Sequence, residues 1–233
     1  MPVREVVFAN DQVYHLYNRG VNHQPIFNHH RDYQRALRTV TFYPYHPLLM
    51  SLSHFLRLNS EEKEKIYPLL KKKDKKIVDV FSFCLMPNHF HFLLKQKKKD
   101  GISRFLSNFQ NSYTRYFNRR HQRSGHLFQG QFKAVWIETD EQLIHVSRYI
   151  HLNPYSSFLV KDFEALKDYP WSSLGEYLNL FDHKICEKET LFSFFPTIKK
   201  LEKFIFDQKD YQRELESIKH LVLEKVYENP EVC

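Results

Sequence analysis

The stretch Met86-Pro87-Asn88-His89-Phe90-His91-Phe92-Leu93-Leu94 combines a turn signal with the beginning of an apolar strand. Proline presets φ and asparagine tolerates left-handed backbone, so Pro87-Asn88 predicts a tight turn. Apolar runs lie on both sides of it, Ile77 to Leu85 before the turn and Phe90 to Leu94 after it. The stretch therefore predicts two antiparallel strands joined by a short connection.

The two histidines of this stretch are predicted to share one face of the second strand. Side chains alternate between the faces of a strand, so His89 and His91 point one way and the intervening apolar residues point toward a helix-covered core. The imidazoles then lie about 7 Å apart at Cα, from a rise of about 3.3 Å per residue, which suits two ligands of one cation. The alternative is that both are ordinary polar residues of a half-exposed face, and the pair alone does not exclude it.

Composition narrows the class of protein. The 233 residues are enough for one substantial domain and an appendage, and the net charge of +8 favours a polyanionic partner such as nucleic acid. There is no GxGxxG or GxxxxGK nucleotide loop, and the widely spaced Cys84, Cys186 and Cys233 form no CxxC zinc motif. The sequence begins without a charged-then-apolar leader and has no run of about 18 apolar residues. We therefore expect a cytoplasmic protein that does not associate with membranes.

Two helices follow the histidine stretch. Ile102 to Arg120 carries an apolar stripe at helical spacing with arginines off the stripe. A second helix is predicted to begin at the capping-box pattern Thr139-Asp140-Glu141-Gln142 and to end at about Asn153, before Pro154. Residues 182–233 are predicted to be separately helical, and residues 44–76, interrupted by prolines, are an insertion that the pattern does not place.

The second helix carries Tyr149 and Asn153 at i and i+4, so both lie on one face, about 6 Å apart at Cβ. Two imidazoles and one amide oxygen leave positions open on Mg²⁺ or Mn²⁺, and a phosphate oxygen can occupy one of them. The Tyr149 phenolate could then attack phosphorus, leaving a 5′-phosphotyrosine and a free 3′-OH. The alternative is a tyrosine packed under the sheet and an asparagine that caps a helix end.

Several ordered motifs resemble the REP-associated tyrosine transposases, a branch of the single-tyrosine transposases with a His-hydrophobe-His motif. The resemblance covers roughly residues 10–180. It rests on Tyr14-His15-Leu16-Tyr17-Asn18-Arg19-Gly20, the histidine stretch, Tyr116-Phe117-Asn118, Arg123-Ser124-Gly125-His126-Leu127-Phe128-Gln129-Gly130, Arg148-Tyr149-Ile150-His151-Leu152-Asn153-Pro154 and Pro170-Trp171-Ser172-Ser173.

The resemblance implies a ferredoxin-like α+β domain over residues 1–180, an antiparallel sheet with packed helices, followed by a helical extension over 181–233. It implies an enzyme that cleaves and rejoins single-stranded DNA at hairpin-associated sites, with Tyr149 as nucleophile and His89 and His91 as ligands of Mg²⁺ or Mn²⁺. Asn153 is the expected third ligand, although insertion-sequence relatives often carry Gln there. The predicted DNA-binding residues, mostly guanidinium forks suited to phosphates, are Asn18, Arg19, Arg115, Arg119, Arg120, Arg123 and His126.

Two other classes of function stay open. A domesticated DNA-binding protein would keep the fold without turnover, and a metal-dependent RNA-processing nuclease would use the same basic surface without a covalent bond to nucleic acid. The sequence does not decide between a monomer and a homodimer, nor does it identify the hairpin.

Overall fold

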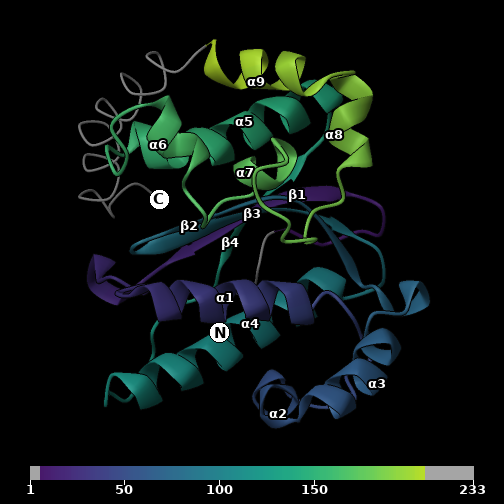
Figure 1. Ribbon diagram of the computed structural model, residues 1–233, viewed down its shortest axis with the longest axis vertical. Coiled ribbons are helices and arrows are strands. Elements are labelled where there is room, and N and C mark those ends of the chain that lie inside the picture. The colour runs from purple at the N-terminus through teal and green to yellow at the C-terminus, as the bar shows by residue number, and fades with distance from the viewer. Residues whose placement is uncertain (1–5, 208–233) are drawn as a thin grey trace, which may run out of the picture.

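A four-stranded antiparallel sheet forms the centre of the protein in the computed structural model, which describes residues 6–207 (Figure 1). The spatial order of the strands is β2-β3-β1-β4. Their bounds are β1 Val13–Arg19, β2 Val78–Met86, β3 His89–Gln96 and β4 Lys133–Ile137. The predicted turn at Pro87-Asn88 joins β2 directly to β3, and the predicted α+β sheet is confirmed.

The connections give this sheet a ferredoxin-like topology. Helix α1 (His30–Phe42) connects β1 to β2, and helix α4 (Gly101–Arg120) connects β3 to β4. Strand β3 therefore lies between β2 and β1 and is antiparallel to both, as in a split βαβ unit. Both helices cover the same face of the sheet (Figure 1).

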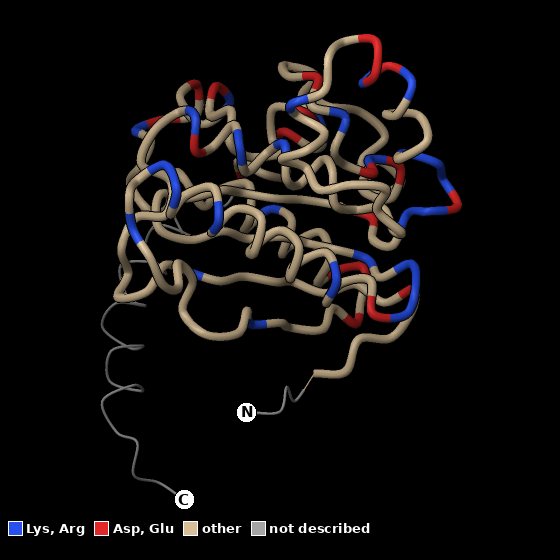
Figure 2. Tube along the Cα trace, turned by 90° about the horizontal axis from the view of Figure 1, so that it is seen from below, with Lys and Arg blue, Asp and Glu red and all other residues tan. Residues whose placement is uncertain are grey.

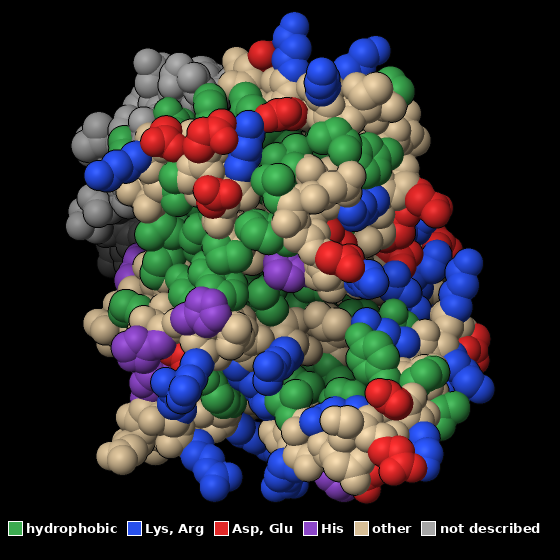
Figure 3. All heavy atoms as spheres, viewed as in Figure 1, with side chains coloured by type: hydrophobic (Ala, Val, Ile, Leu, Met, Phe, Trp, Pro, Cys, Tyr) green, Lys and Arg blue, Asp and Glu red, His purple; other side chains and the backbone are tan. Residues whose placement is uncertain are grey.

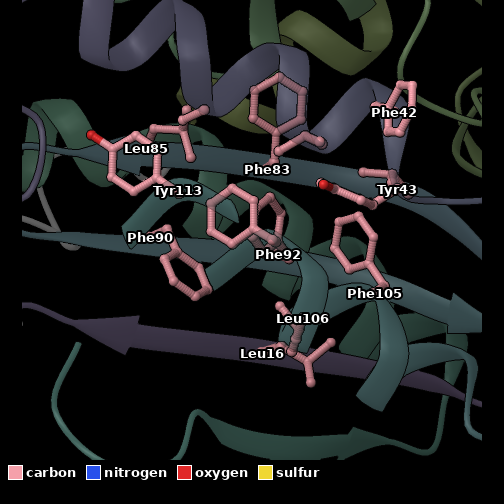
Figure 4. Close-up of a cluster of buried hydrophobic side chains, with 14 of the residues drawn as sticks. Leu16, Phe42, Tyr43, Phe83, Leu85, Phe90, Phe92, Phe105, Leu106 and Tyr113 are labelled. Carbon is pink, nitrogen blue, oxygen red and sulfur yellow. The ribbon is translucent and has the colours of Figure 1, made fainter. Parts of the chain in front are cut away.

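Side chains alternate between the two faces of each strand, and each face of the sheet packs against its own hydrophobic core. On the α1/α4 face, Phe90 and Phe92 pack edge-to-face against Phe109 of α4, and all three are fully buried. Figure 4 shows this cluster, with Leu16 from β1 and Phe83 from β2 contributing to the same core. On β3, the residues that face α1 and α4 are therefore the apolar ones that alternate with the two histidines.

The opposite face is covered by the C-terminal half of the described chain, which includes helix α5 (Asp140–Ser156). Thr139 caps this helix as predicted, because its Oγ1 accepts the Gln142 N–H at 3.2 Å. The predicted end at Asn153 is wrong, since α5 continues to Ser156. Pro154 offers no N–H to the Ile150 carbonyl, but the helix continues beyond it, and the Ser157 N–H donates to the Asn153 carbonyl at 3.0 Å.

Four short helices complete this layer (Figure 1). They are α6 (Phe163–Lys167), α7 (Leu174–Tyr177), α8 (Glu189–Phe194) and α9 (Ile198–Phe206). Leu201 and Ile205 of α9 are buried in the same core as Ile150 of α5. Residues 182–207 are thus partly helical as predicted. Residues 208–233 lie outside the described residues, and the division at residue 180 stays a prediction.

The insertion at 44–76 contains helices α2 (Leu52–Arg57) and α3 (Ser60–Leu70). The start of α3 has a capping box, in which Asn59 Oδ1 accepts the Glu62 N–H at 2.9 Å and Glu62 accepts the Asn59 N–H at 3.0 Å. Phe55 of α2 packs on Phe42 of α1, so the insertion extends the α1/α4 core. Within residues 6–207, no helix combines the length and apolar character needed to cross a membrane.

Candidate functional site

His89 and His91 lie together on the α5 face of β3. Their ring centroids are 5.0 Å apart with the ring planes at 89°. In the sheet, His89 pairs with Met86 and His91 with Cys84 of β2, while Arg19 and Tyr17 of β1 pair with them on the other side. The period-2 alternation of β3 therefore brings both imidazoles to one surface, beneath α5.

Asn153 of α5 lies between the two rings. Its Oδ1 is 3.4 Å from His89 Nε2, and its Nδ2 is 3.4 Å from His91 Nε2. Asn153 and His91 are buried, with 4% and 6% of their surface exposed, whereas His89 is half-buried. The three side chains that were predicted as metal ligands therefore converge on one small space with access from the His89 side.

Hydrogen bonds determine which ring nitrogens face Asn153. His89 Nδ1 is 2.7 Å from Asn88 Oδ1, an acceptor, so Nδ1 carries the proton and donates. His91 Nδ1 is 3.0 Å from His15 Nε2, and in the tautomer in which His91 donates this bond its Nε2 accepts from Asn153 Nδ2. The neutral tautomers thus turn two nitrogen lone pairs toward Asn153, which is the form that binds a metal.

Tyr149 lies one helical turn before Asn153 and reaches the same site. Its ring centroid is 5.5 Å from that of His91 and 6.0 Å from that of His15, with edge-on geometry in both cases. The side chain is half-buried, so it packs beside the histidines while remaining accessible. The i, i+4 spacing on α5 therefore places a phenol next to the candidate ligands.

The donor set suits a divalent cation only if further ligands come from outside the protein. Among residues 6–207, no group of three or more His, Cys, Asp or Glu side chains is arranged to hold a metal. Two imidazoles and an amide oxygen make a smaller set, with no carboxylate, and it would leave coordination positions for phosphate oxygens and water. The residues present fit a metal that is shared with an anionic substrate.

Tyr113 and Tyr116 of α4 lie on the other face of the sheet. Tyr113 is fully buried and its hydroxyl donates to the Ile26 carbonyl, and burial raises its pKa far above the ordinary value. The Tyr116 hydroxyl donates to Asp32 Oδ1 at 3.2 Å, and its pKa is raised by burial and by that carboxylate. Neither environment favours a phenolate, and the two rings are separated from the histidine pair by the sheet.

The predicted DNA-binding residues of β1 differ in exposure. Asn18 is only 5% exposed, and its Oδ1 accepts the Arg19 N–H at 2.8 Å. Arg19 lies directly across from His89 in the β1–β3 register, and its Nε donates to Gln129 Oε1 at 2.7 Å. Asn18 therefore shapes the end of β1, whereas Arg19 places a positive charge beside the histidine pair.

The remaining predicted DNA-binding residues gather at the C-terminal end of α4 and in the loop after it. Arg115, Arg119, Arg123 and His126 are exposed, and Arg123 donates to the His126 carbonyl at 3.0 Å. Figure 2, which views the molecule from the α1/α4 side, marks the Lys and Arg positions along these helices. Arg120 differs from the others, because its Nε pairs with the buried Asp32 carboxylate at 3.3 Å.

A cavity of about 500 Å³ opens next to this basic end of α4. The residues that line it include amide side chains, a phenylalanine ring, an imidazole and a guanidinium. They are Val21, Asn22, Gln24, Pro25, Asn28, Phe117, His121, Arg123 and Leu127. Such a mixture of ring faces and hydrogen-bonding groups is suited to an unpaired base.

Sequence reasoning missed His15 as a member of the site. Because side chains alternate between the faces of β1, His15 lies on the opposite face from the core residue Leu16. This was the one indication in the sequence that His15 could belong to the site. Recognising its role requires the pairing of β1 with β3, which brings together side chains 76 residues apart in the chain.

The fold and this site together define an α+β domain of ferredoxin-like topology that carries a histidine pair, an amide and a tyrosine on one face of its sheet. Residues 39–153 match the family model described as "Transposase IS200 like". This stretch includes His89, His91, Tyr149 and Asn153. Over this stretch, the chain is similar to the IS200-like transposases.

The chain was also compared with solved structures and with curated proteins. A similar solved structure is described as "Structure of the REP associates tyrosine transposase bound to a REP hairpin". It has 13% sequence identity and a TM-score of 0.49, covering 78% of this chain and 90% of that chain. No curated protein matches the chain.

Proposed function

We propose that this protein cleaves and rejoins single-stranded DNA at hairpin-associated sites, through a 5′-phosphotyrosine intermediate at Tyr149 and with a divalent metal held by His89, His91 and Asn153. The observation that carries the proposal is the convergence of these four side chains beneath α5. Asn153 lies 3.4 Å from both Nε2 atoms, and the Tyr149 ring lies 5.5 Å from His91. The match of residues 39–153 to the IS200-like transposases supports it.

Tyr149 would supply the nucleophile. Its phenol oxygen forms a bond to phosphorus while the bond from phosphorus to the 3′-oxygen breaks, and the 3′-oxygen leaves with a proton as a free hydroxyl. A phenol with the ordinary pKa of about 10 costs about 4 kcal/mol to ionise at neutral pH. Removal of its proton during attack and positive charge at the scissile phosphate would lower this cost.

Positive charge comes from two sources in this proposal. Mg²⁺ or Mn²⁺, when bound, would withdraw charge from the scissile phosphate. Arg19, opposite His89 in the sheet, is placed to bind a phosphate oxygen next to that position. Because the phosphotyrosine keeps the energy of the broken bond, the 3′-hydroxyl of a second DNA end can reverse the attack and rejoin strands.

The net charge of +8 and the arginines at the end of α4 support DNA as the partner. The REP-associated branch of the family, the cytoplasmic location and the choice between monomer and homodimer remain parts of this proposal that rest on the sequence. A DNA-binding protein without turnover would share the basic surface but would form no covalent bond.

Trapping the covalent intermediate tests the proposal. We expect protein incubated with Mn²⁺ and single-stranded DNA from the flanks of its own gene to give a slower band on a denaturing gel. Tyr149→Phe removes one hydroxyl and keeps the ring, so it should abolish this band without changing the melting temperature. Tyr116→Phe, the matched control on the opposite face of the sheet, should retain it.

Peptide mapping of the trapped band then identifies the modified residue. Phosphotyrosine at position 149 is the expected result. A DNA adduct at position 113 or 116, or an adduct that survives Tyr149→Phe, would show that the active-site helix has been assigned incorrectly.

A further inference from the structure

A short segment after α6 extends the sheet beyond its edge strand β2. The Ser173 N–H donates to the Phe83 carbonyl at 2.9 Å, and the Leu85 N–H donates to the Trp171 carbonyl at 2.9 Å. Trp171 packs against both hydrophobic cores, and Figure 3 shows hydrophobic side chains on the surface where the α1/α4 layer meets the α5 layer. The segment belongs to the motif Pro170-Trp171-Ser172-Ser173, which has no part in the chemistry proposed above.

Ser173 connects this segment to α5. Its hydroxyl oxygen accepts the Phe83 N–H at 2.9 Å and lies 3.2 Å from the Phe83 carbonyl oxygen, to which it donates. The Nε2 atom of His151, on α5, is 2.8 Å from the same hydroxyl oxygen. With the hydroxyl proton on Phe83, His151 Nε2 donates this bond. Both side chains are fully buried, so the imidazole joins α5 to the backbone of β2 through one serine.

A second polar contact between α5 and β2 lies one helical turn earlier. The Ser147 and Ser82 hydroxyl oxygens are 2.6 Å apart, and both residues are buried. The neighbouring residues Ile150 and Leu152 are fully buried in the apolar core between helix and sheet. Apolar packing alone specifies a position weakly, whereas a hydrogen bond is directional and is lost when its groups move apart. The two polar contacts therefore fix where α5 lies along β2.

Stability alone does not explain an imidazole at position 151. Its Nδ1 atom is buried and has no hydrogen-bond partner among residues 6–207. Burial lowers the pKa of His151 to about 3, so the ring lies in the core as a neutral group whose hydrogen bonds are incomplete. An apolar side chain of similar volume would avoid that cost. It could not, however, form the directional bond to Ser173.

We propose that His151 is a positioning residue, which fixes the register of α5 on the sheet so that Tyr149 and Asn153 meet His89 and His91. This inference rests on the proposed function, because it concerns the geometry of the same site. At 100° per residue, His151 lies about 160° around the helix from both Tyr149 and Asn153. It therefore reaches toward the segment outside β2, while they reach toward the histidines of β3.

Strand β2 connects this contact with the proposed metal ligands. Phe83, which bonds to Ser173, pairs with Phe92 of β3, and the next pair along the two strands is Cys84 with His91. The register of α5 against β2 is therefore also its register against β3. A displacement of about 1 Å at a reacting group can reduce a rate about 100-fold. Loss of the His151 bond should thus affect the chemical step more than folding.

The test compares His151→Leu with His151→Gln in the full chain. Leucine removes the bond, whereas the glutamine side-chain amide can donate to the Ser173 hydroxyl or accept from it. With Mn²⁺ and saturating single-stranded flank DNA, the rate of covalent band formation should fall about 10- to 100-fold in His151→Leu. The DNA concentration that gives half the maximal rate should stay within about twofold, since DNA binding is unchanged. His151→Gln should recover most of the rate, and the melting temperature of His151→Leu should not fall.

A second measurement needs neither DNA nor metal. The Tyr149 ring lies edge-on to His91, with 5.5 Å between the ring centroids, so its ring current shifts the His91 signals in NMR spectra of ¹³C-histidine-labelled protein. Spectra of His91→Gln assign these signals. We expect them to move in His151→Leu, because α5 changes its position, and to keep their place in His151→Gln.

An unchanged rate or unchanged His91 signals in His151→Leu would overturn the inference. Equal losses in the leucine and glutamine variants would also overturn it, because the bond to Ser173 would not be the cause. A leucine variant that fails to fold would show that His151 serves stability and not register. If the unmodified protein forms no covalent band, the proposed function fails, and the His91 signals still decide whether His151 sets the position of α5.

Discussion

Replacing His15 with phenylalanine tests whether this residue orients His91. His91 Nδ1 and His15 Nε2 are 3.0 Å apart, and when His91 donates this bond it takes the tautomer whose unprotonated Nε2 faces Asn153. Phenylalanine keeps a ring of similar size but offers no acceptor. His91 would then keep an unsatisfied Nδ1–H in a place where 6% of the residue is exposed, or move the proton to Nε2 and lose the lone pair that binds metal.

The expected loss of metal affinity can be taken from other metal sites in which a ligating histidine has a hydrogen-bond partner. Removing the hydrogen-bond partner of a ligating histidine typically lowers metal affinity 10- to 100-fold, which corresponds to about 1.4–2.7 kcal/mol. We therefore expect the Kd for Mn²⁺, measured by isothermal titration calorimetry without DNA, to rise by about that factor in His15→Phe. His15→Gln, which retains an amide oxygen as acceptor, should lose less.

His54→Phe provides the matched control, because His54 is an exposed histidine of α2 on the other side of the sheet. Its Mn²⁺ affinity should equal that of the unmodified protein. If His15→Phe folds normally and binds Mn²⁺ within about twofold of the unmodified protein, the hydrogen bond does not orient the ligand and our reasoning on the tautomer is refuted.

The other predictions concern the ligands and one buried acid. His89→Ala or His91→Ala should abolish the covalent band while leaving DNA binding within a few-fold, and full activity in EDTA would contradict the metal assignment. Asn153→Ala should reduce the rate less, because water can replace an amide oxygen on Mg²⁺, and complete loss would contradict this. Burial raises the pKa of Glu176, so its contribution to stability is present below the unfolded pKa and is lost as pH rises through the folded pKa. In urea unfolding, the free energy of unfolding of the unmodified protein relative to Glu176→Gln should therefore fall as pH rises above about 4, the ordinary pKa of glutamate, and a constant difference would contradict it.

The parts of the site that could be predicted from the sequence depend on local geometry. Alternation along one strand was enough to place His89 and His91 on a single face, and the i, i+4 rule was enough to group Tyr149 with Asn153. That the two groups meet was a prediction from motif resemblance, because nothing local states that α5 covers β3. The end of α5 was predicted wrongly, since proline removes one donor from a last turn without forcing the helix to stop there.

The features that sequence reasoning missed depend on contacts between distant segments. His15 joins the site only through the pairing of β1 with β3. The groove of about 300 Å³ between α1, α2 and α4 forms only because α1 packs against α4, so the spacing of Arg31, Arg35 and Arg38 along α1 did not indicate it by itself. That Asn18 contacts DNA stays a prediction; in the structure its Oδ1 accepts the Arg19 N–H at the end of the strand.

The end of β1 is tied to the wall of the 500 Å³ cavity and to the turn before β3. The buried Asp32 carboxylate lies 3.3 Å from Arg120 Nε and 3.1 Å from His121 Nε2, and His121 also lines this cavity. The cavity wall continues to Val21, next to Gly20, whose N–H donates to the Asn88 carbonyl at 2.7 Å.

Gly20 has to be glycine at this junction, because a Cβ there would lie 2.2 Å from the Gln24 carbonyl oxygen. The chain thereby stays close to the turn before His89, with Arg19 directly opposite that histidine. Glycine at position 20 therefore keeps Arg19 and the Pro87-Asn88 turn together beside His89, so the end of β1 forms one edge of the candidate site.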